Sequence, residues 1–187
     1  MKVVAAVARK ELRDAVSSSW LLMYGALFTV LALGLSYLCE RNLGSVGFEN
    51  FSRTTASLLN LCLLLAPLAA LSLGAGAIAG ERDRGALTYL LSQPLDRWEL
   101  LIGKFAGLSA SIAIATLAGF GIAGIVIAFY ASMLAVGTYV MLVALVLALV
   151  CVMTGLGLVA SVISATRVQA LGLALLIWFV AVFVFDL

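Results

Sequence analysis

Histidine is absent from this sequence, which excludes an HExxH metalloprotease motif, a histidine-based catalytic triad and any histidine metal ligand. Cysteine is nearly as scarce. The three cysteines, Cys39, Cys62 and Cys151, lie far apart and form neither a CxxC motif nor a zinc-like spacing. We therefore expect no metal site, and we interpret Cys62 and Cys151 as buried apolar side chains.

Charge is also scarce. Charged residues make up 11% of the chain and hydrophobic residues 65%, and none of residues 105–166 is charged. A soluble domain has about 25% charged and about 45–50% apolar residues, because water must wet its surface. The net charge of +2 is divided among small clusters, which argues against a nucleic-acid partner. The composition therefore predicts an integral membrane protein in contact with lipid.

Long apolar runs divide the chain into a short N-terminal helix and a transmembrane domain. Residues 1–19 have charged side chains on one helical face and apolar ones on the other. This pattern predicts an amphipathic helix in the membrane interface, the alternative being a solvated helix before the first span. Residues 20–187 predict an all-α, polytopic helical bundle, since about 20 apolar residues suffice for each crossing. The five predicted spans lie at about 20–38, 54–79, 102–130, 138–164 and 168–185. Pro67 is expected to kink the second span.

Lysine and arginine are unequally divided between the two sides of these spans. If the chain alternates, the N-terminal segment, the segment 80–101 with Lys104, and Arg167 share one side and contain nine basic residues. The other side has only Arg41 and Arg53. Because basic loops stay inside, the N-terminus and the segment 80–101 are predicted to face the cytoplasm.

Small residues recur at every fourth position along the third predicted span. Such a stripe lets a second helix approach closely and predicts helix packing rather than ligand binding. The alternative is that small residues are simply common in membrane helices. The stripe consists of Gly103, Gly107, Ser111, Ala115, Gly119 and Ala123. Gly76 and Gly80 form a shorter version at the end of the second span.

The charged segment between spans two and three is too long for a tight turn. A short helix with Leu87, Leu90 and Leu91 on one side is expected to follow the alternating charges and to end at Pro94. Asp96, with Glu99 three residues later, resembles the N-cap of the next helix. The pattern predicts a short helix across the cytoplasmic face, rigidly joined to two spans. An interfacial loop with a basic rim is the alternative.

The sequence GERDRGALTYLLSQPLDRWELLIGKFAG, from Gly80 onward, resembles the hallmark of type-2 ABC exporter permeases, ERxxGTL…LLxxPxxR…GK. The N-terminal ARKEL resembles the opening of the same family. The resemblance implies a coupling helix that docks on a separate ATPase subunit, with charged residues as the dock and leucines in an apolar groove. It assigns this role to Glu81, Arg82, Asp83, Arg84, Gly85, Leu87, Tyr89, Leu90, Leu91, Pro94, Asp96 and Arg97.

Within that family, the chain is most similar to permeases of multi-copper enzyme maturation transporters, of the kind that serves nitrous oxide reductase. The resemblance implies the inner membrane of a bacterium or archaeon. The implied partners are an ABC ATPase, a second permease subunit, like or unlike, and a periplasmic maturation protein. No copper site is expected in the chain, because Cys151 and Met153 fall on different faces of a helix and Met141 lies nearly three turns away.

The sequence departs from the family pattern in two places. Family permeases normally have six spans, and here the sequence stops at Leu187 after five. We expect either a truncated sequence or a shortened member whose sixth helix is lost or supplied elsewhere. Ala86 stands where the motif has threonine, although the next leucine, Leu87, is kept.

The sequence has no ATP-binding loop. Gly103 and Lys104 are followed by Phe105, without the Ser or Thr and the upstream glycine that such a loop needs. We expect no enzyme activity and no cofactor in this chain, with ATP and magnesium bound by the partner subunit. The alternatives are a non-transporting membrane scaffold or assembly subunit, or a channel or carrier.

Overall fold

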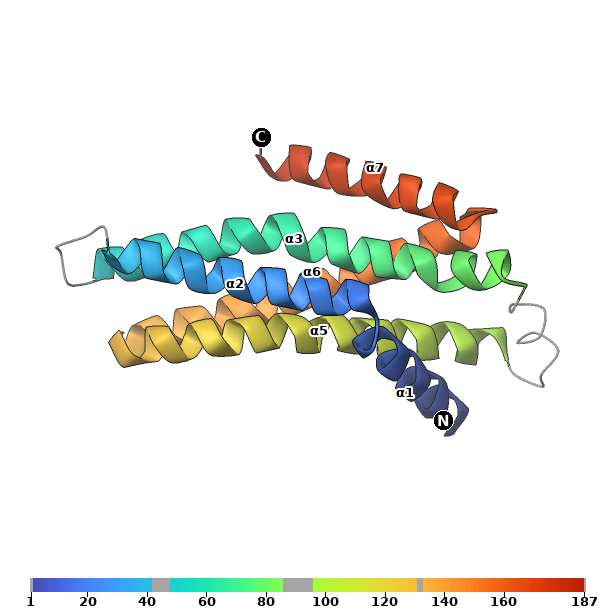
Figure 1. Ribbon diagram of the computed structural model, residues 1–187, viewed down its shortest axis with the longest axis horizontal. Helices are drawn as coiled ribbons and strands as arrows, with labels where there is room; N and C mark the ends of the chain where they lie inside the picture. The colour runs from blue at the N-terminus through green and yellow to red at the C-terminus, as the bar shows by residue number, and fades with distance from the viewer. Residues whose placement is uncertain (1, 42–47, 86–95, 131–132, 187) are drawn as a thin grey trace.

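The computed structural model describes residues 2–41, 48–85, 96–130 and 133–186 (Figure 1). The regular structure of these residues is α-helical throughout, which confirms the all-α prediction. In chain order the helices are α1 (Lys2–Val16), α2 (Ser19–Arg41), α3 (Phe48–Asp83), α5 (Arg97–Tyr130), α6 (Met133–Ile163) and α7 (Arg167–Asp186).

Four long helices, α2, α3, α5 and α6, run along the same axis, and α7 lies beside α3 (Figure 1). The short helix α1 is bent away from α2 by 65° and packs mainly on α5. Ser18 marks the bend, where its Oγ accepts a hydrogen bond from the amide of Leu21 at 3.3 Å and caps α2. The break between α1 and α2 thus follows from a capping serine.

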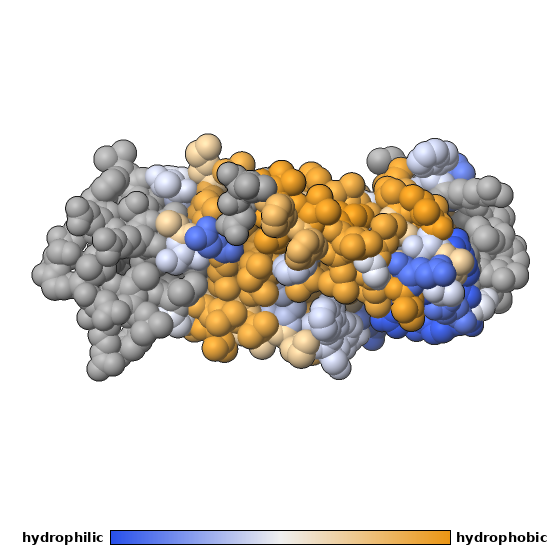
Figure 2. Space-filling view, turned by 90° about the horizontal axis from the view of Figure 1, so that it is seen from above, coloured by the Kyte–Doolittle hydropathy of each residue, from blue (hydrophilic) through white to orange (hydrophobic). Residues whose placement is uncertain are grey.

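Among the described residues, four helical segments are long and apolar enough to cross a membrane, and a fifth is added if the bent pair of α1 and α2 counts as one span. The four are Leu59–Asp83, Trp98–Gly121, Gly137–Ile163 and Arg167–Val184. Figure 2 shows an apolar band around the middle of the molecule and polar surface at one end. These features confirm a polytopic helical membrane bundle. Helices α3 and α5 extend beyond the predicted apolar spans into more polar sequence.

A close helix crossing joins α3 and α6 through two glycines. A Cβ on Gly74 would lie 2.7 Å from the carbonyl oxygen of Thr154, and a Cβ on Gly157 would lie 2.7 Å from that of Leu71. The two backbones are therefore in direct contact. Neither glycine belongs to the small-residue pattern found in the sequence, so this crossing was not predicted.

The predicted stripe on α5 faces α1 and α2. A Cβ on Gly103 would lie 2.8 Å from the Val7 side chain, and one on Gly119 would lie 2.5 Å from the Phe28 ring. Gly107 contacts α1, Ser111 is fully buried and Ala115 approaches Gly25 of α2. The side chain of Ala123 lies outside the described part of the structure.

Two of the cysteines lie in different environments. Cys62 is buried in α3 as expected, whereas Cys151 is exposed on α6, so the prediction that it is buried was wrong. Position 151 lies on the face of α6 that points away from the bundle, together with Val152 and Val159. A cysteine on an apolar face can contact lipid as readily as protein, and hydropathy does not distinguish the two.

The glycine crossing yields a stability prediction. Gly74→Ala should destabilise the bundle by about 1–3 kcal/mol, because its new methyl group would overlap backbone atoms that cannot rotate away. Gly172→Ala is the matched control, since nothing lies within 4 Å of a Cβ at that helical position. Denaturant unfolding in detergent micelles measures both. Equal stability of the two variants would show that α3 and α6 are not in contact at Gly74.

Candidate functional site

One end of the bundle gathers most of the described charged side chains. The helix α1, the last turn of α3, the first turns of α5 and the connection between α6 and α7 meet there (Figure 1), and Figure 2 shows the polar surface at this end. We call this region the charged end. Residues 86–95 connect α3 to α5 at this end and lie outside the described residues.

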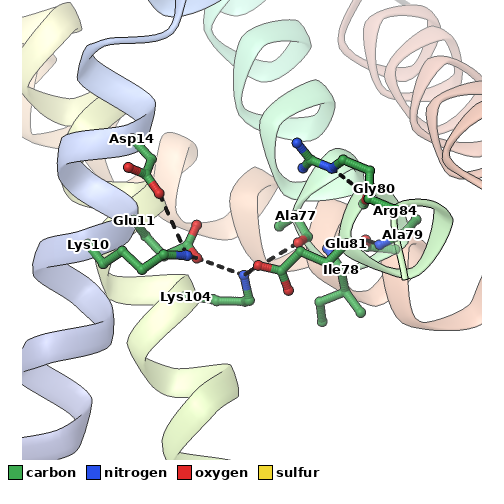
Figure 3. Close-up of polar contacts among 11 residues, drawn as sticks. Lys10, Glu11, Asp14, Ala77, Ile78, Ala79, Gly80, Glu81, Arg84 and Lys104 are labelled. Carbon is green, nitrogen blue, oxygen red and sulfur yellow. Dashed lines mark hydrogen bonds and ion pairs between the residues drawn. The ribbon is translucent and has the colours of Figure 1, made fainter. Parts of the chain in front are cut away.

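Lys104 occupies the centre of the charged end. Its side chain is 1% exposed, and its Nζ donates to Oε1 of Glu11 and to Oε1 of Glu81, both at 2.7 Å (Figure 3). A longer contact of 3.4 Å reaches the carbonyl oxygen of Ala77. Because these residues belong to α1, α3 and α5, one ammonium group ties three helices together. We call Glu11, Lys104 and Glu81 the buried triad.

The buried triad contains two acids and one base. The exposed Lys10 lies 3.8 Å from Glu11 and also pairs with Asp14 at 3.6 Å. The Oε2 atom of Glu81 is buried and has no hydrogen-bond partner among the described residues. Since a buried charge is costly unless paired, Glu81 depends on Lys104, whereas the part-buried Glu11 also has Lys10 nearby.

Glycines on α5 set the distance at which Glu11 meets Lys104. Gly103 and Gly107 both face α1, and a Cβ on Gly107 would lie 2.7 Å from Cβ of Glu11 and 2.5 Å from the carbonyl oxygen of Ala8. With larger residues there, α1 could not approach closely enough for its carboxylate to reach Nζ. The small residues thus contribute to the polar contact as well as to packing.

A second group of contacts ties the end of α3 to the connection between α6 and α7. The guanidinium of Arg82 donates to the carbonyl oxygen of Ser164, and Oδ2 of Asp83 accepts from the amide of Arg167 at 2.8 Å. The Oγ of Ser161 accepts from the amides of Ile78 and Ala79 at 3.0 and 2.8 Å. Helix α3 is therefore fixed on this side by side chains and backbone of its neighbours.

Asp83 also completes the N-terminus of α7. Arg167 is the first residue of that helix, and its amide would otherwise lack a partner inside the helix. A carboxylate at this position also interacts favourably with the helix dipole. Thr166 contributes a further cap by accepting from the amide of Gln169 at 3.3 Å.

The residues assigned to ATPase coupling fall into three groups. Glu81, Arg82 and Asp83 are engaged with neighbouring helices, so that Glu81 points inward rather than outward. Arg84, Gly85 and Asp96 are exposed, and α5 begins at Arg97. The residues Leu87, Tyr89, Leu90, Leu91 and Pro94 lie outside the described part of the chain, and the side chain of Arg97 is likewise not described.

Gly85 ends α3 in the way that a glycine C-cap does. Its φ is 70°, a value that side-chain-bearing residues rarely adopt, and its amide donates to the carbonyl oxygen of Arg82 at 3.0 Å. The chain therefore changes direction just after Arg84.

Sequence reasoning missed the role of Glu11 and Lys104. Lys104 was counted with the basic loops, but it lies within α5 and is buried. The available signal was its position, because it is the last charge before a long uncharged run and stands next to Gly103. A lysine inside an apolar helix usually faces a partner rather than lipid.

The described residues do not bring three or more histidine, cysteine, aspartate or glutamate side chains together in a way that could hold a metal ion. What the charged end offers is mechanical connection. The two helices that flank residues 86–95 are joined to each other through Glu81 and Lys104, and to α1 through Glu11. The three helices are therefore held together at the end of the bundle where this segment is attached.

Comparison with known proteins points to a transport family. A family model described as ABC-2 family transporter protein matches residues 5–187. The probable ABC transporter permease protein NosY of Pseudomonas aeruginosa is 39% identical over 100% of this chain and 70% of its own length. The protein of the same name from Stutzerimonas stutzeri is 38% identical over 100% of this chain and 69% of its own length.

The buried triad gives a second stability prediction. Lys104→Met should destabilise the protein by about 3–5 kcal/mol, because the buried carboxylate of Glu81 and the part-buried one of Glu11 lose their shared partner. Denaturant unfolding in detergent micelles measures the change.

Two further variants test the cause of that loss. Lys10→Met is the matched control and should cost less than about 1 kcal/mol, since Lys10 is exposed. Combining Lys104→Met with Glu11→Gln and Glu81→Gln should restore much of the stability by removing the unpaired charges. A triple variant less stable than Lys104→Met alone would contradict this role of the lysine.

Proposed function

The chain belongs to the ABC-2 transporter family and is an ABC transporter permease subunit, and we propose that it couples ATP hydrolysis by a separate ATPase subunit to export. A permease is not a catalytic enzyme by itself. In this proposal the ATPase binds ATP and magnesium, and the described helices receive the resulting movement. The GERDRG motif at Gly80–Gly85 and the segment that follows it form the docking region.

The observation that carries this proposal is the attachment of both ends of the segment 86–95. Glu81 lies in the last turn of α3 and Lys104 near the start of α5. Nζ of Lys104 is 2.7 Å from Oε1 of Glu81, so the two helices are tied together beside the segment. A force on the connecting segment therefore moves α3 and α5 together instead of bending them apart. The contact with Glu11 extends the movement to α1.

The inward orientation of Glu81 divides the motif into two roles. Glu81, Arg82 and Asp83 hold the end of α3 in the bundle. The leucines after Gly85 are then left for the ATPase, with Leu90 and Leu91 in an apolar groove. This division agrees with the turn at Gly85, which ends α3 before these leucines.

The distribution of basic residues supports a cytoplasmic position for the charged end. Most lysines and arginines of the chain, including Arg82, Arg84, Lys104 and Arg167, belong to segments that meet there. Since basic residues near span ends are retained inside, the N-terminus and the docking region face the cytoplasm in this proposal.

A second permease subunit, identical or different, completes the transporter in this proposal, as the family resemblance implies. We further propose that the transporter serves the maturation of a multi-copper enzyme such as nitrous oxide reductase, together with a periplasmic maturation protein. The identity of 38–39% to two permeases named NosY supports this narrower assignment. The localisation that follows is the inner membrane.

The orientation is tested by a tag. An epitope inserted after Gly85 should be inaccessible to an impermeant reagent in intact cells and become accessible once the inner membrane is permeabilised. An epitope inserted after Gly44, in the connection between α2 and α3, is the matched control and should be accessible from outside the inner membrane. The reverse pattern would place the charged end outside and exclude ATPase docking on it.

Coupling is tested at the leucines of the docking segment. Leu90→Asp or Leu91→Asp should abolish stimulation of the ATPase by the permease, because a carboxylate cannot enter an apolar groove without large desolvation cost. Membrane insertion, measured by membrane fractionation, should be unaffected. In the native host, the same variants should lower the copper content of nitrous oxide reductase.

Ser92→Asp is the matched control for these variants. It adds the same charge to the same segment, at a polar position off the helical face that Leu87, Leu90 and Leu91 are expected to share. It should retain most of the ATPase stimulation. Full stimulation in Leu90→Asp and Leu91→Asp would end the coupling proposal, and normal copper content with lost stimulation would remove the narrower assignment alone.

A further inference from the structure

We propose that Arg84 and Arg167 form a binding site for the phosphate group of an anionic phospholipid at the membrane boundary of the charged end. The two arginines are far apart in the sequence and lie at the ends of different helices, one just after α3 and one at the start of α7. Neither membership of the family nor the coupling proposal gives Arg167 a role. The site depends on the chain being in a membrane and stands independently of the ATPase.

Both guanidinium groups lie against the same face of α3. The position that a Cβ would take on Gly80 is 3.8 Å from Nη2 of Arg84 and 3.9 Å from Nε of Arg167. Nε of Arg167 is also 3.9 Å from the corresponding point on Gly76. Since both groups approach one point, a single phosphate with its several acceptor oxygens can contact both.

Glycine at positions 76 and 80 makes this arrangement compatible with close packing. The side chain of Arg167 lies along α3, where its Cδ is 3.6 Å from the Cβ position on Gly80. Arg84 folds back toward the same residue, and its Nε donates to the carbonyl oxygen of Gly80 at 3.0 Å. A guanidinium group has five N–H donors, so this bond leaves donors of Arg84 that can face a phosphate.

The local charge is positive on balance, because two arginines lie beside the single carboxylate of Asp83. Among the described side chains, ion pairs are formed by Lys10 and Lys104 but not by these arginines. Asp83 is the nearest acid in sequence, and its Oδ2 is engaged by the amide of Arg167. The sequence of residues 86–95, ALTYLLSQPL, contains no acid that could neutralise Arg84.

The two arginines stand at the ends of two candidate membrane segments. Arg84 directly follows the membrane segment Leu59–Asp83, and Arg167 begins the segment Arg167–Val184. Basic residues that flank membrane helices at this level bind anionic headgroups. The position favours a lipid phosphate over an ion in bulk solution.

The surface next to the arginines suits acyl chains. Ile163 is 72% exposed just before the connection to α7, and Val168 is 79% exposed just after Arg167. Of the window that makes α7 a candidate span, only 11% is buried in the structure. A phospholipid can therefore place its phosphate between Arg84 and Arg167 and its chains along α7.

Native mass spectrometry of the purified full-length chain in detergent tests the site. Phosphatidylglycerol and phosphatidylcholine are titrated separately, and the Kd of the first bound lipid is measured. We expect phosphatidylglycerol to bind more tightly than phosphatidylcholine. Arg84→Gln and Arg167→Gln should each raise the Kd for phosphatidylglycerol about fivefold, because one basic residue near a charged headgroup contributes about 1 kcal/mol. Arg84→Lys and Arg167→Lys should retain most of the preference, because they keep the charge.

Arg13→Gln is the matched control, since Arg13 is an exposed arginine at the same end of the bundle, on α1. It should leave the Kd unchanged. Equal affinity of the unaltered chain for the two lipids would overturn the proposal without any variant. Complete displacement of phosphatidylglycerol by millimolar inorganic phosphate would also overturn the proposal, since the arginines would then bind free phosphate. So would an Arg84→Gln variant that kept lipid affinity but lost ATPase stimulation, since Arg84 would then bind the ATPase.

Discussion

The ammonium group of Lys104, held between the carboxylates of Glu11 and Glu81, fixes the relative positions of three helices at the charged end. Contacts between apolar side chains tolerate sliding, and lipid chains compete with them because they are equally apolar. A buried charge tolerates neither loss of its partner nor a large change in distance. The triad therefore specifies how α1, α3 and α5 meet, which the surrounding apolar packing alone would leave less defined.

The apolar part of the bundle and the triad depend on each other. Backbone contact at Gly74 and Gly157 holds α3 against α6, and Gly107 lets α1 approach α5. The second approach brings Glu11 within 2.7 Å of Lys104. A larger residue at Gly107 would therefore disturb an ion pair as well as a packing contact. In this bundle small residues position polar groups, although they contain no polar side-chain atoms themselves.

Composition was sufficient to predict the helical membrane bundle, because a soluble fold could hardly bury an uncharged run as long as residues 105–166. The motif after Gly80 was sufficient for the family, and Asp96 for the start of α5 at Arg97. The partners of Lys104 were not predictable, since Glu11 is 93 residues away and hydropathy does not show which helices adjoin. The exposure of Cys151 and the crossing at Gly74 were missed for the same reason. Each depends on which face of a helix meets a neighbour. The sequence does not distinguish small or apolar residues that face protein from those that face lipid.

The last turn of α3 shows why charged residues follow one another in the motif. Successive residues of a helix point about 100° apart, and here Glu81 reaches Lys104, Arg82 reaches Ser164 and Asp83 reaches the amide of Arg167. Each charge thus has its own neighbour, so no single contact can be displaced without straining the others. In the coupling proposal, movement that enters α3 from residues 86–95 passes through this turn. Because the turn is held from several directions, the rigid response is displacement of the helices together, and Gly85 supplies the change of chain direction that leaves Arg84 outside.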